Sequence, residues 1–115
     1  MKRKIRTVIL VIGVVIAAFS GYKHYKHTFT TEKWVKSDEK VKMVDDMLEN
    51  NEIVGMTREG VISLLGEETE SAYYKEKDNM VYWLGLERGL MSIDSEWLVI
   101  NFKNNVATDY HITTD

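Results

Sequence analysis

The sequence contains no cysteine, and this absence excludes several kinds of chemistry at once. Without a thiol the chain forms no disulfide, holds no metal through thiolates and has no cysteine nucleophile. It also has no cysteine on which an N-terminal lipid anchor could be built. The redox compartment stays open, because a domain without cysteine tolerates oxidising and reducing surroundings alike.

Catalytic and phosphate-binding motifs are also missing. There is no Gly-rich phosphate loop, and no serine stands in the glycine pattern of a nucleophile elbow. Asp94 and Glu96 are neighbouring carboxylates, which we interpret as a solvated acidic edge because acid–base catalysis needs a cleft and shifted pKa values. His24 and His27 offer two metal ligands, whereas a stable site needs three or four. We therefore expect no enzyme, no cofactor and no metal site.

Positive charge is scarce outside the N-terminus. Residues 1–27 contain six Lys or Arg and no acid, whereas residues 28–115 contain nine basic and 18 acidic side chains. The net charge of −3 therefore divides into +6 and −9, which suggests two segments in different surroundings. An acidic domain is a poor partner for a phosphate backbone, so we expect no nucleic-acid binding. The length of 115 residues leaves room for one modest domain.

The N-terminus carries a long apolar run. Thr7–Tyr22 is an uncharged stretch of 16 residues that includes the apolar run Val8–Phe19 and follows the basic segment Met1–Arg6. A perpendicular bilayer span needs about 20 residues, and snorkelling of the flanking Arg6 and Lys23 makes up the difference. We predict residues 1–22 to be a signal-anchor, that is, a retained transmembrane helix.

A cleaved signal peptide is the alternative. Ala18 and Ser20 place small residues at the −3 and −1 positions before Gly21, so secretion after cleavage near Ser20 stays open. Four Lys or Arg precede the apolar run, against Lys23 and Lys26 just after it, which favours a cytoplasmic N-terminus. The acidic remainder is then extracytoplasmic in both cases.

The rest of the chain divides into a linker and a domain. We interpret residues 23–36 as a polar juxtamembrane linker that turns helical toward Trp34, and residues 37–115 as an extracytoplasmic domain. Ser37 can cap an amphipathic helix whose apolar residues recur at helical spacing: Val41, Val44, Met47 and Leu48. A second, shorter helix has Thr57 as its N-cap and Gly66 as its C′ residue.

After this second helix the hydrophobic period changes from 3.6 to about 2. The pattern predicts two hairpins, which pair Ser71–Glu76 with Met80–Leu84 and Glu96–Phe102 with Val106–Ile112. One face of each strand needs covering, and the two preceding helices are available for it. We therefore predict an α+β domain of order ααββββ, with two helices on a three- to four-stranded antiparallel meander, preceded by a transmembrane helix.

The connection between the predicted hairpins, residues 85–95, is longer than a hairpin needs and carries several apolar side chains. Such a loop either folds back over an open end of the core or binds a partner. We name five candidate partner-contact residues in or beside it: Leu86, Arg88, Leu90, Met91 and Trp97.

The string Gly-Met-Thr-Arg-Glu-x-Val-x-x-Leu-Leu-Gly at residues 55–66 precedes a tyrosine-rich hairpin and a strand that ends Tyr110-His111-Ile112. This arrangement resembles the BamE (SmpA/OmlA-like) family and the related β-lactamase-inhibitor-protein-like fold, from about Val41 to Ile112. The resemblance implies a small extracytoplasmic interaction domain without enzymatic activity. The chain departs from the pattern in lacking an acylated cysteine and in having Glu67 where a proline is usual, so membership of a β-barrel assembly machine is not carried over.

Together these features predict a membrane-tethered protein-interaction module of a bacterial cell envelope, with an accessory or scaffolding role. The expected partners are the membrane, through the N-terminal helix, and an envelope protein, rather than nucleic acid or a small molecule. The alternative function is binding of a lipid or cell-wall fragment in a groove between helices and sheet, beside Tyr73, Tyr82 and Trp83.

Overall fold

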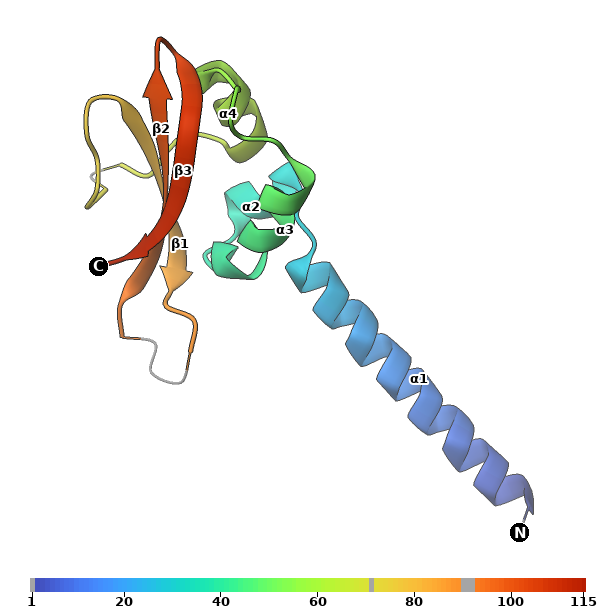
Figure 1. The fold of residues 1–115 in the computed structure, drawn as a ribbon. Helices are drawn as coiled ribbons and strands as arrows, with labels where there is room; N and C mark the ends of the chain where they lie inside the picture. The colour runs from blue at the N-terminus through green and yellow to red at the C-terminus, as the bar shows by residue number, and fades with distance from the viewer. Residues whose placement is uncertain (1, 71, 90–92) are drawn as a thin grey trace.

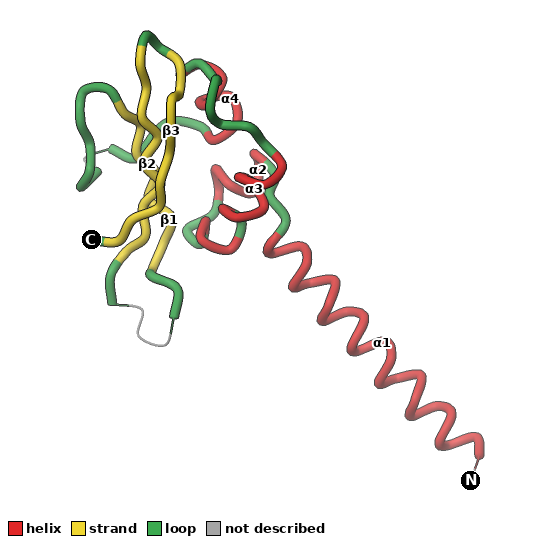
Figure 2. The backbone as a smooth tube through the Cα atoms, viewed as in Figure 1, coloured by secondary structure: helices red, strands yellow, loops and turns green. Residues whose placement is uncertain are grey.

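The computed structural model describes residues 2–70, 72–89 and 93–115, which form a long N-terminal helix and a two-layer domain (Figure 1). The helices are α1 (Lys2–His27), α2 (Thr31–Lys36), the 3-10 turn η1 (Lys40–Lys42), α3 (Val44–Asn50) and α4 (Arg58–Leu65). The strands are β1 (Asn79–Leu86), β2 (Ser95–Lys103) and β3 (Val106–Thr114). The short helices cover one face of an antiparallel sheet while α1 projects away from it (Figure 2), which confirms the predicted α+β class.

Helix α1 extends the molecule to 71 Å along its longest axis. Its segment Arg6–His27 is long and apolar enough to cross a membrane, and the domain buries none of it. A helix with apolar side chains on all sides is stable only where an apolar medium, such as a protein core or a bilayer, surrounds it. The helix is therefore a candidate membrane span, although a signal sequence has the same length and composition.

The core begins earlier in the chain than the domain boundary at residue 37. Trp34 in α2 is fully buried, and the ring of Phe29 meets it edge-on at 5.7 Å between centroids. Thr30 caps α2 by accepting a hydrogen bond from the Lys33 amide. Residues 29–36, interpreted from the sequence as linker, therefore include packed elements of the domain.

The helix predicted after Ser37 is broken into two pieces. The Ser37 hydroxyl accepts a bond from the Glu39 amide at 2.9 Å, which favours a turn over a helix cap. The chain then forms η1, and α3 starts only after Met43. Val44 and Met47 are nevertheless buried on the core side, as the spacing predicts.

The capped helix α4 forms as predicted. Thr57 Oγ1 accepts a bond from the Gly60 amide at 3.1 Å, and Gly66 ends the helix at a φ of 76°, where glycine is favoured. Two backbone bonds between residues 55–56 and Ala107 fasten the start of this helix to β3. The segment therefore joins the helical layer to the sheet.

Gly60 offers a test of this capping geometry. A Cβ atom there would lie 3.4 Å from Thr57 Oγ1 and farther from any other atom, which is ordinary contact. Gly60→Ala is therefore expected to raise the free energy of unfolding by about 0.5–1 kcal/mol. Gly60→Glu should stabilise the domain at least as much, because an N3 glutamate completes a capping box with Thr57. Urea denaturation checks both variants, and a lower midpoint for Gly60→Ala would contradict the open geometry.

The described residues form a three-stranded sheet of order β1-β2-β3. Both pairings are antiparallel, and the β2–β3 hairpin turns at Asn104 and Asn105 with φ values of 54° and 65°. Asparagine tolerates this left-handed geometry, so the second predicted hairpin is confirmed.

The predicted strand over residues 71–76 does not form. Ser71 lies outside the described residues, and residues 72–76 contain turns but no strand. The Asn79 side chain explains this, because it donates to the Tyr74 carbonyl at 3.0 Å and accepts from the Glu76 amide at 2.9 Å. Thr69 lies beside the edge of β1 instead, and its hydroxyl accepts a hydrogen bond from the Trp83 amide.

Candidate functional site

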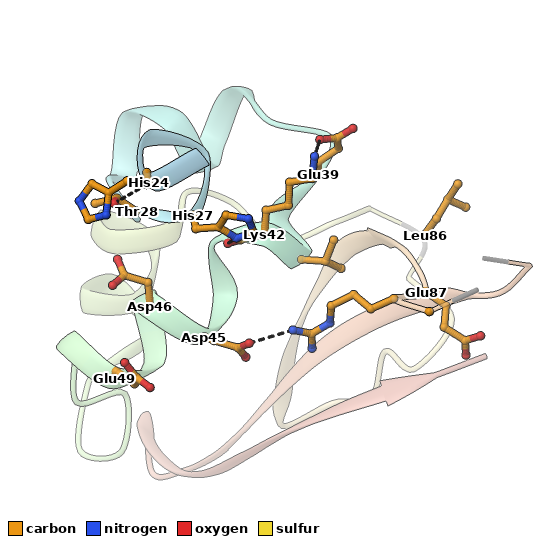
Figure 3. A pocket seen from close by; sticks show the side chains of 13 residues that line it. His24, His27, Thr28, Glu39, Lys42, Asp45, Asp46, Glu49, Leu86 and Glu87 are labelled. Carbon is orange, nitrogen blue, oxygen red and sulfur yellow. Dashed lines mark hydrogen bonds and ion pairs between the residues drawn. The ribbon is translucent and has the colours of Figure 1, made fainter. Parts of the chain in front are cut away.

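A groove of about 660 Å³ lies between the end of α1 and the chain that leaves β1 (Figure 3). Its walls come from three parts of the chain, and its lining residues are His24, His27, Thr28, Glu39, Val41, Lys42, Asp45, Asp46, Glu49, Leu86, Glu87, Arg88 and Gly89. The loop predicted as a binding loop therefore meets the end of α1 at this groove.

Hydrogen bonds fix the end of α1 to the wall of the groove that η1 and α3 form. His27 Nδ1 lies 2.9 Å from the Lys42 carbonyl oxygen in η1. The Phe29 amide donates to Asp46 Oδ2 in α3 at 2.7 Å. These bonds hold the helix end against η1 and α3, so the groove is built into the junction between α1 and the domain.

The opposite wall, formed by residues 86–89, depends on close backbone contact between Gly85 and Asp38. This residue has a φ of 124°, and a Cβ atom there would lie 3.1 Å from the Asp38 carbonyl oxygen. Only glycine combines this backbone angle with such proximity. The contact brings β1 against the chain entering η1 and places Leu86, which is 58% exposed, on the groove.

Arg88 closes one side of the groove by joining the loop after β1 to α3 and β2. Its Nη1 lies 2.9 Å from Asp45 Oδ2 in α3, and its Nη2 lies 2.9 Å from Glu96 Oε1 in β2. The Arg88 amide also donates to Glu96 Oε2 at 2.8 Å. The start of the loop is thereby fastened to both layers of the domain.

Glu96 corrects the interpretation of a solvated acidic edge. It is buried, at 6% exposure, while Asp94 is exposed as expected. Burial raises the pKa of the Glu96 carboxyl, but the hydrogen bonds from the Arg88 side chain and amide outweigh it, so the pKa lies below its usual value. The hydrogen bond from the same guanidinium to Glu96 is the main reason that the pKa of Arg88 is raised.

The groove combines an apolar surface with an acidic rim. Val41 and Leu86 contribute apolar side chains, and five carboxylates line it against two fixed cations, Lys42 and Arg88. Within residues 2–70, 72–89 and 93–115 no group of three or more His, Cys, Asp or Glu could hold a metal ion. The lining therefore offers a small apolar surface beside acidic side chains.

The structure brings together some of the residues predicted for partner contact and separates others. Leu86 and Arg88 line the groove. Trp97 is 9% exposed on the outer face of the sheet, where it clusters with Val81 and Val99. Leu90 and Met91 lie outside the described residues. Sequence reasoning did not assign the wall made by η1 and α3, whose only signal was a run of charges beside apolar positions.

The two tyrosines and the tryptophan predicted to line a lipid or cell-wall groove lie in different parts of the domain. Tyr82 is buried on the helix side of the sheet, where its hydroxyl donates to the Gly66 carbonyl at 2.7 Å and burial raises its pKa. Trp83 packs on the outer face, and Tyr73 is 74% exposed. These three side chains therefore do not line one groove.

Comparison of the chain with family models, curated proteins and solved structures gave no match. The resemblance of residues 55–66 to the BamE family therefore stays a prediction from one motif.

Proposed function

We propose that the protein is a membrane-tethered interaction module, in which α1 is the anchor and the groove docks a segment of a partner protein. In this proposal the role is accessory or scaffolding and involves no catalysis. The observation that carries it is the position of the groove, which is lined by the last turn of the candidate membrane helix and by the domain together.

The size and chemistry of the groove support a polypeptide as its occupant. A volume of about 660 Å³ is within the range of about 300–1,000 Å³ of clefts that hold drug-sized ligands, and is therefore room for a side chain or two of a bound segment. The apolar side chains of Val41 and Leu86 suit an apolar anchor residue, and the excess of five carboxylates over two cations favours basic neighbours beside it. A partner segment of mixed basic and apolar character satisfies both parts.

Tethering narrows the choice of partner further. A groove at the end of a membrane helix is confined near the bilayer surface, where another membrane or envelope protein is held at high effective concentration. We place the domain on the extracytoplasmic side, as part of the proposal, on the basic segment before the apolar run and on the BamE-like motif.

Affinity capture from detergent-solubilised membranes tests the proposal. Leu86→Asp puts a charge on the apolar part of the groove and should reduce partner capture at least about tenfold, since burying an unpaired charge is costly. Ile93→Asp is the matched control, because Ile93 is 72% exposed and is not among the groove residues. Equal capture by folded wild type and Leu86→Asp would refute the groove assignment.

The anchor and its orientation are checked in the same cells. A tag placed after Asp115 should be accessible to protease outside intact, wall-stripped cells, and the full chain should stay in the membrane fraction. Protection of the tag would contradict the extracytoplasmic placement. Release of a shortened chain that starts near Gly21 would show a cleaved signal peptide in place of the anchor.

A further inference from the structure

A second cavity, the lysine pocket, lies beside the groove and shares Glu39 and Lys42 with it. It encloses about 270 Å³. Its lining contains four lysines and one carboxylate among eight residues: Tyr25, Lys26, Lys33, Lys36, Ser37, Glu39, Lys42 and Met43. The four ammonium groups and the single carboxylate leave the pocket with a formal charge of +3.

Several of these ammonium groups are held in place by the fold. Lys33 Nζ donates to the Tyr25 carbonyl at 2.6 Å and stands 4.1 Å from the centre of the Tyr25 ring. The Glu39 carboxylate pairs with Lys42 at 2.9 Å and reaches Lys26 at 4.0 Å. The carbonyl and the ring orient Lys33 without neutralising it. Lys36 lies 3.5 Å from the exposed Glu32 carboxylate, and Lys26 and Lys42 share Glu39. The four ammonium groups therefore face two carboxylates, and a formal charge of +2 remains for an anion.

The pocket is the positive pole of a domain that is otherwise acidic. Residues 23–42 contain six lysines and three acids, whereas residues 43–115 contain five basic and 15 acidic side chains. The charge therefore changes from +3 to −10 between the junction with α1 and the rest of the domain. An anion near the end of α1 is attracted to this pole, and the remainder of the domain repels it.

We propose that the lysine pocket binds the phosphate of an anionic phospholipid headgroup from the bilayer that α1 enters. The proposal depends on the anchor part of the proposed function, because only a membrane helix brings headgroups to Tyr25 and Lys26. Lysine is a common phosphate-binding side chain, and an ammonium group attracts the phosphate of an anionic headgroup in whichever leaflet it faces. Tyrosine at the end of such a helix belongs at the headgroup level.

Binding there gives the domain a preferred orientation on the membrane. The lysine pocket faces the anionic surface, and the acidic residues after Lys42 are repelled from it. The groove shares residues with the pocket, so its mouth is held near the bilayer. The lipid thus acts as an orienting ligand and the groove remains the partner site.

The test uses the full chain in a neutral detergent, with native mass spectrometry to count bound lipids. Phosphatidylglycerol and phosphatidylcholine are titrated separately, and inorganic phosphate is added as a competitor. The Lys33→Gln/Lys36→Gln variant removes two charges from the pocket. Lys77→Gln/Lys103→Gln is the matched control, because it removes the same charge from exposed positions elsewhere.

Wild type should bind phosphatidylglycerol at least about fivefold more tightly than phosphatidylcholine, and the pocket variant should lose about tenfold in phosphatidylglycerol affinity. The control should stay within about twofold of wild type, since its charges lie outside the pocket.

Equal binding of both lipids, or equal losses in the two variants, would overturn the proposal. Displacement of the lipid by millimolar inorganic phosphate would show a site for a soluble anion instead. Membrane fractionation tests the anchor and partner capture by Leu86→Asp tests the groove. Both measurements are separate from lipid binding, so failure of the proposed function is distinguishable from failure of the lipid site.

Discussion

Replacing Trp34 with alanine is expected to lower the free energy of unfolding of the domain by about 3–5 kcal/mol. The side chain is fully buried at the centre of the helix–sheet core, so its removal leaves a large cavity. A small domain has only about 5–15 kcal/mol of stability in total, so much of it would be lost. Trp34→Phe should cost less, because the indole Nε1 has no hydrogen-bond partner among the described residues.

Urea denaturation followed by the fluorescence of Trp83 and Trp97 measures this loss. Val35→Ala is the matched control, because the neighbouring Val35 is 56% exposed. A chain that begins at residue 37 lacks Trp34 and should fail to give a cooperative transition, whereas one that begins at residue 28 should give it. An unchanged midpoint for Trp34→Ala would show that residues 29–36 are not part of the stable domain.

The features that could be predicted from the sequence depend on near neighbours. The cap of α4 needs only Thr57, Gly60 and Gly66, which lie within ten residues, and its geometry follows from those residue types. The β2–β3 turn likewise needs only two asparagines between strands of alternating pattern. The α+β class follows because one helical and one alternating pattern must cover each other.

The features that could not be predicted depend on contacts between distant residues. Trp34 sits in a polar stretch, and nothing local indicates that the domain buries it. The tyrosine-rich residues 72–76 have strand propensity, but the Asn79 side chain binds their backbone and holds them in a loop. A register shift between Asn101 and Phe102 also breaks the alternation of the hairpin, so the small Ala107 faces the core while the larger Val106 is exposed.

Only one wall of the candidate site could be predicted from the sequence, because the other wall depends on contacts between distant residues. The loop after β1 was recognised by its length and its apolar residues, and Leu86 does line the groove. The other wall lies 43 residues earlier in the chain at Asp45, and only the folded chain brings it to Arg88. Trp97 was assigned to this site by its position in sequence, but strand alternation turns it to the outer face.

The second large effect is expected at the ion pair between Arg88 and Glu96. Arg88→Met leaves the Glu96 carboxylate buried with only the amide of residue 88 to stabilise its charge, and should cost about 2–4 kcal/mol. Glu96→Gln should cost less, because the Arg88 side chain is 44% exposed and keeps Asp45 as a partner. The order of these two losses, measured by urea denaturation at pH 7, tests which partner depends on the other.

The stability of Arg88→Met should respond to pH differently from that of wild type. In wild type the pKa of Glu96 is below its ordinary value of 4.5, so its contribution to stability is present above that value and is lost as the pH falls through the folded-state pKa. In Arg88→Met burial of the carboxyl outweighs the remaining bond, and the folded-state pKa rises above the ordinary value. Protonation then favours the folded state, so the variant should gain stability as the pH falls from 7 toward 5 while wild type changes little. Parallel stability curves for the two proteins across that range would show that Arg88 does not set the charge of Glu96, and the loop would need another explanation for its attachment to the sheet.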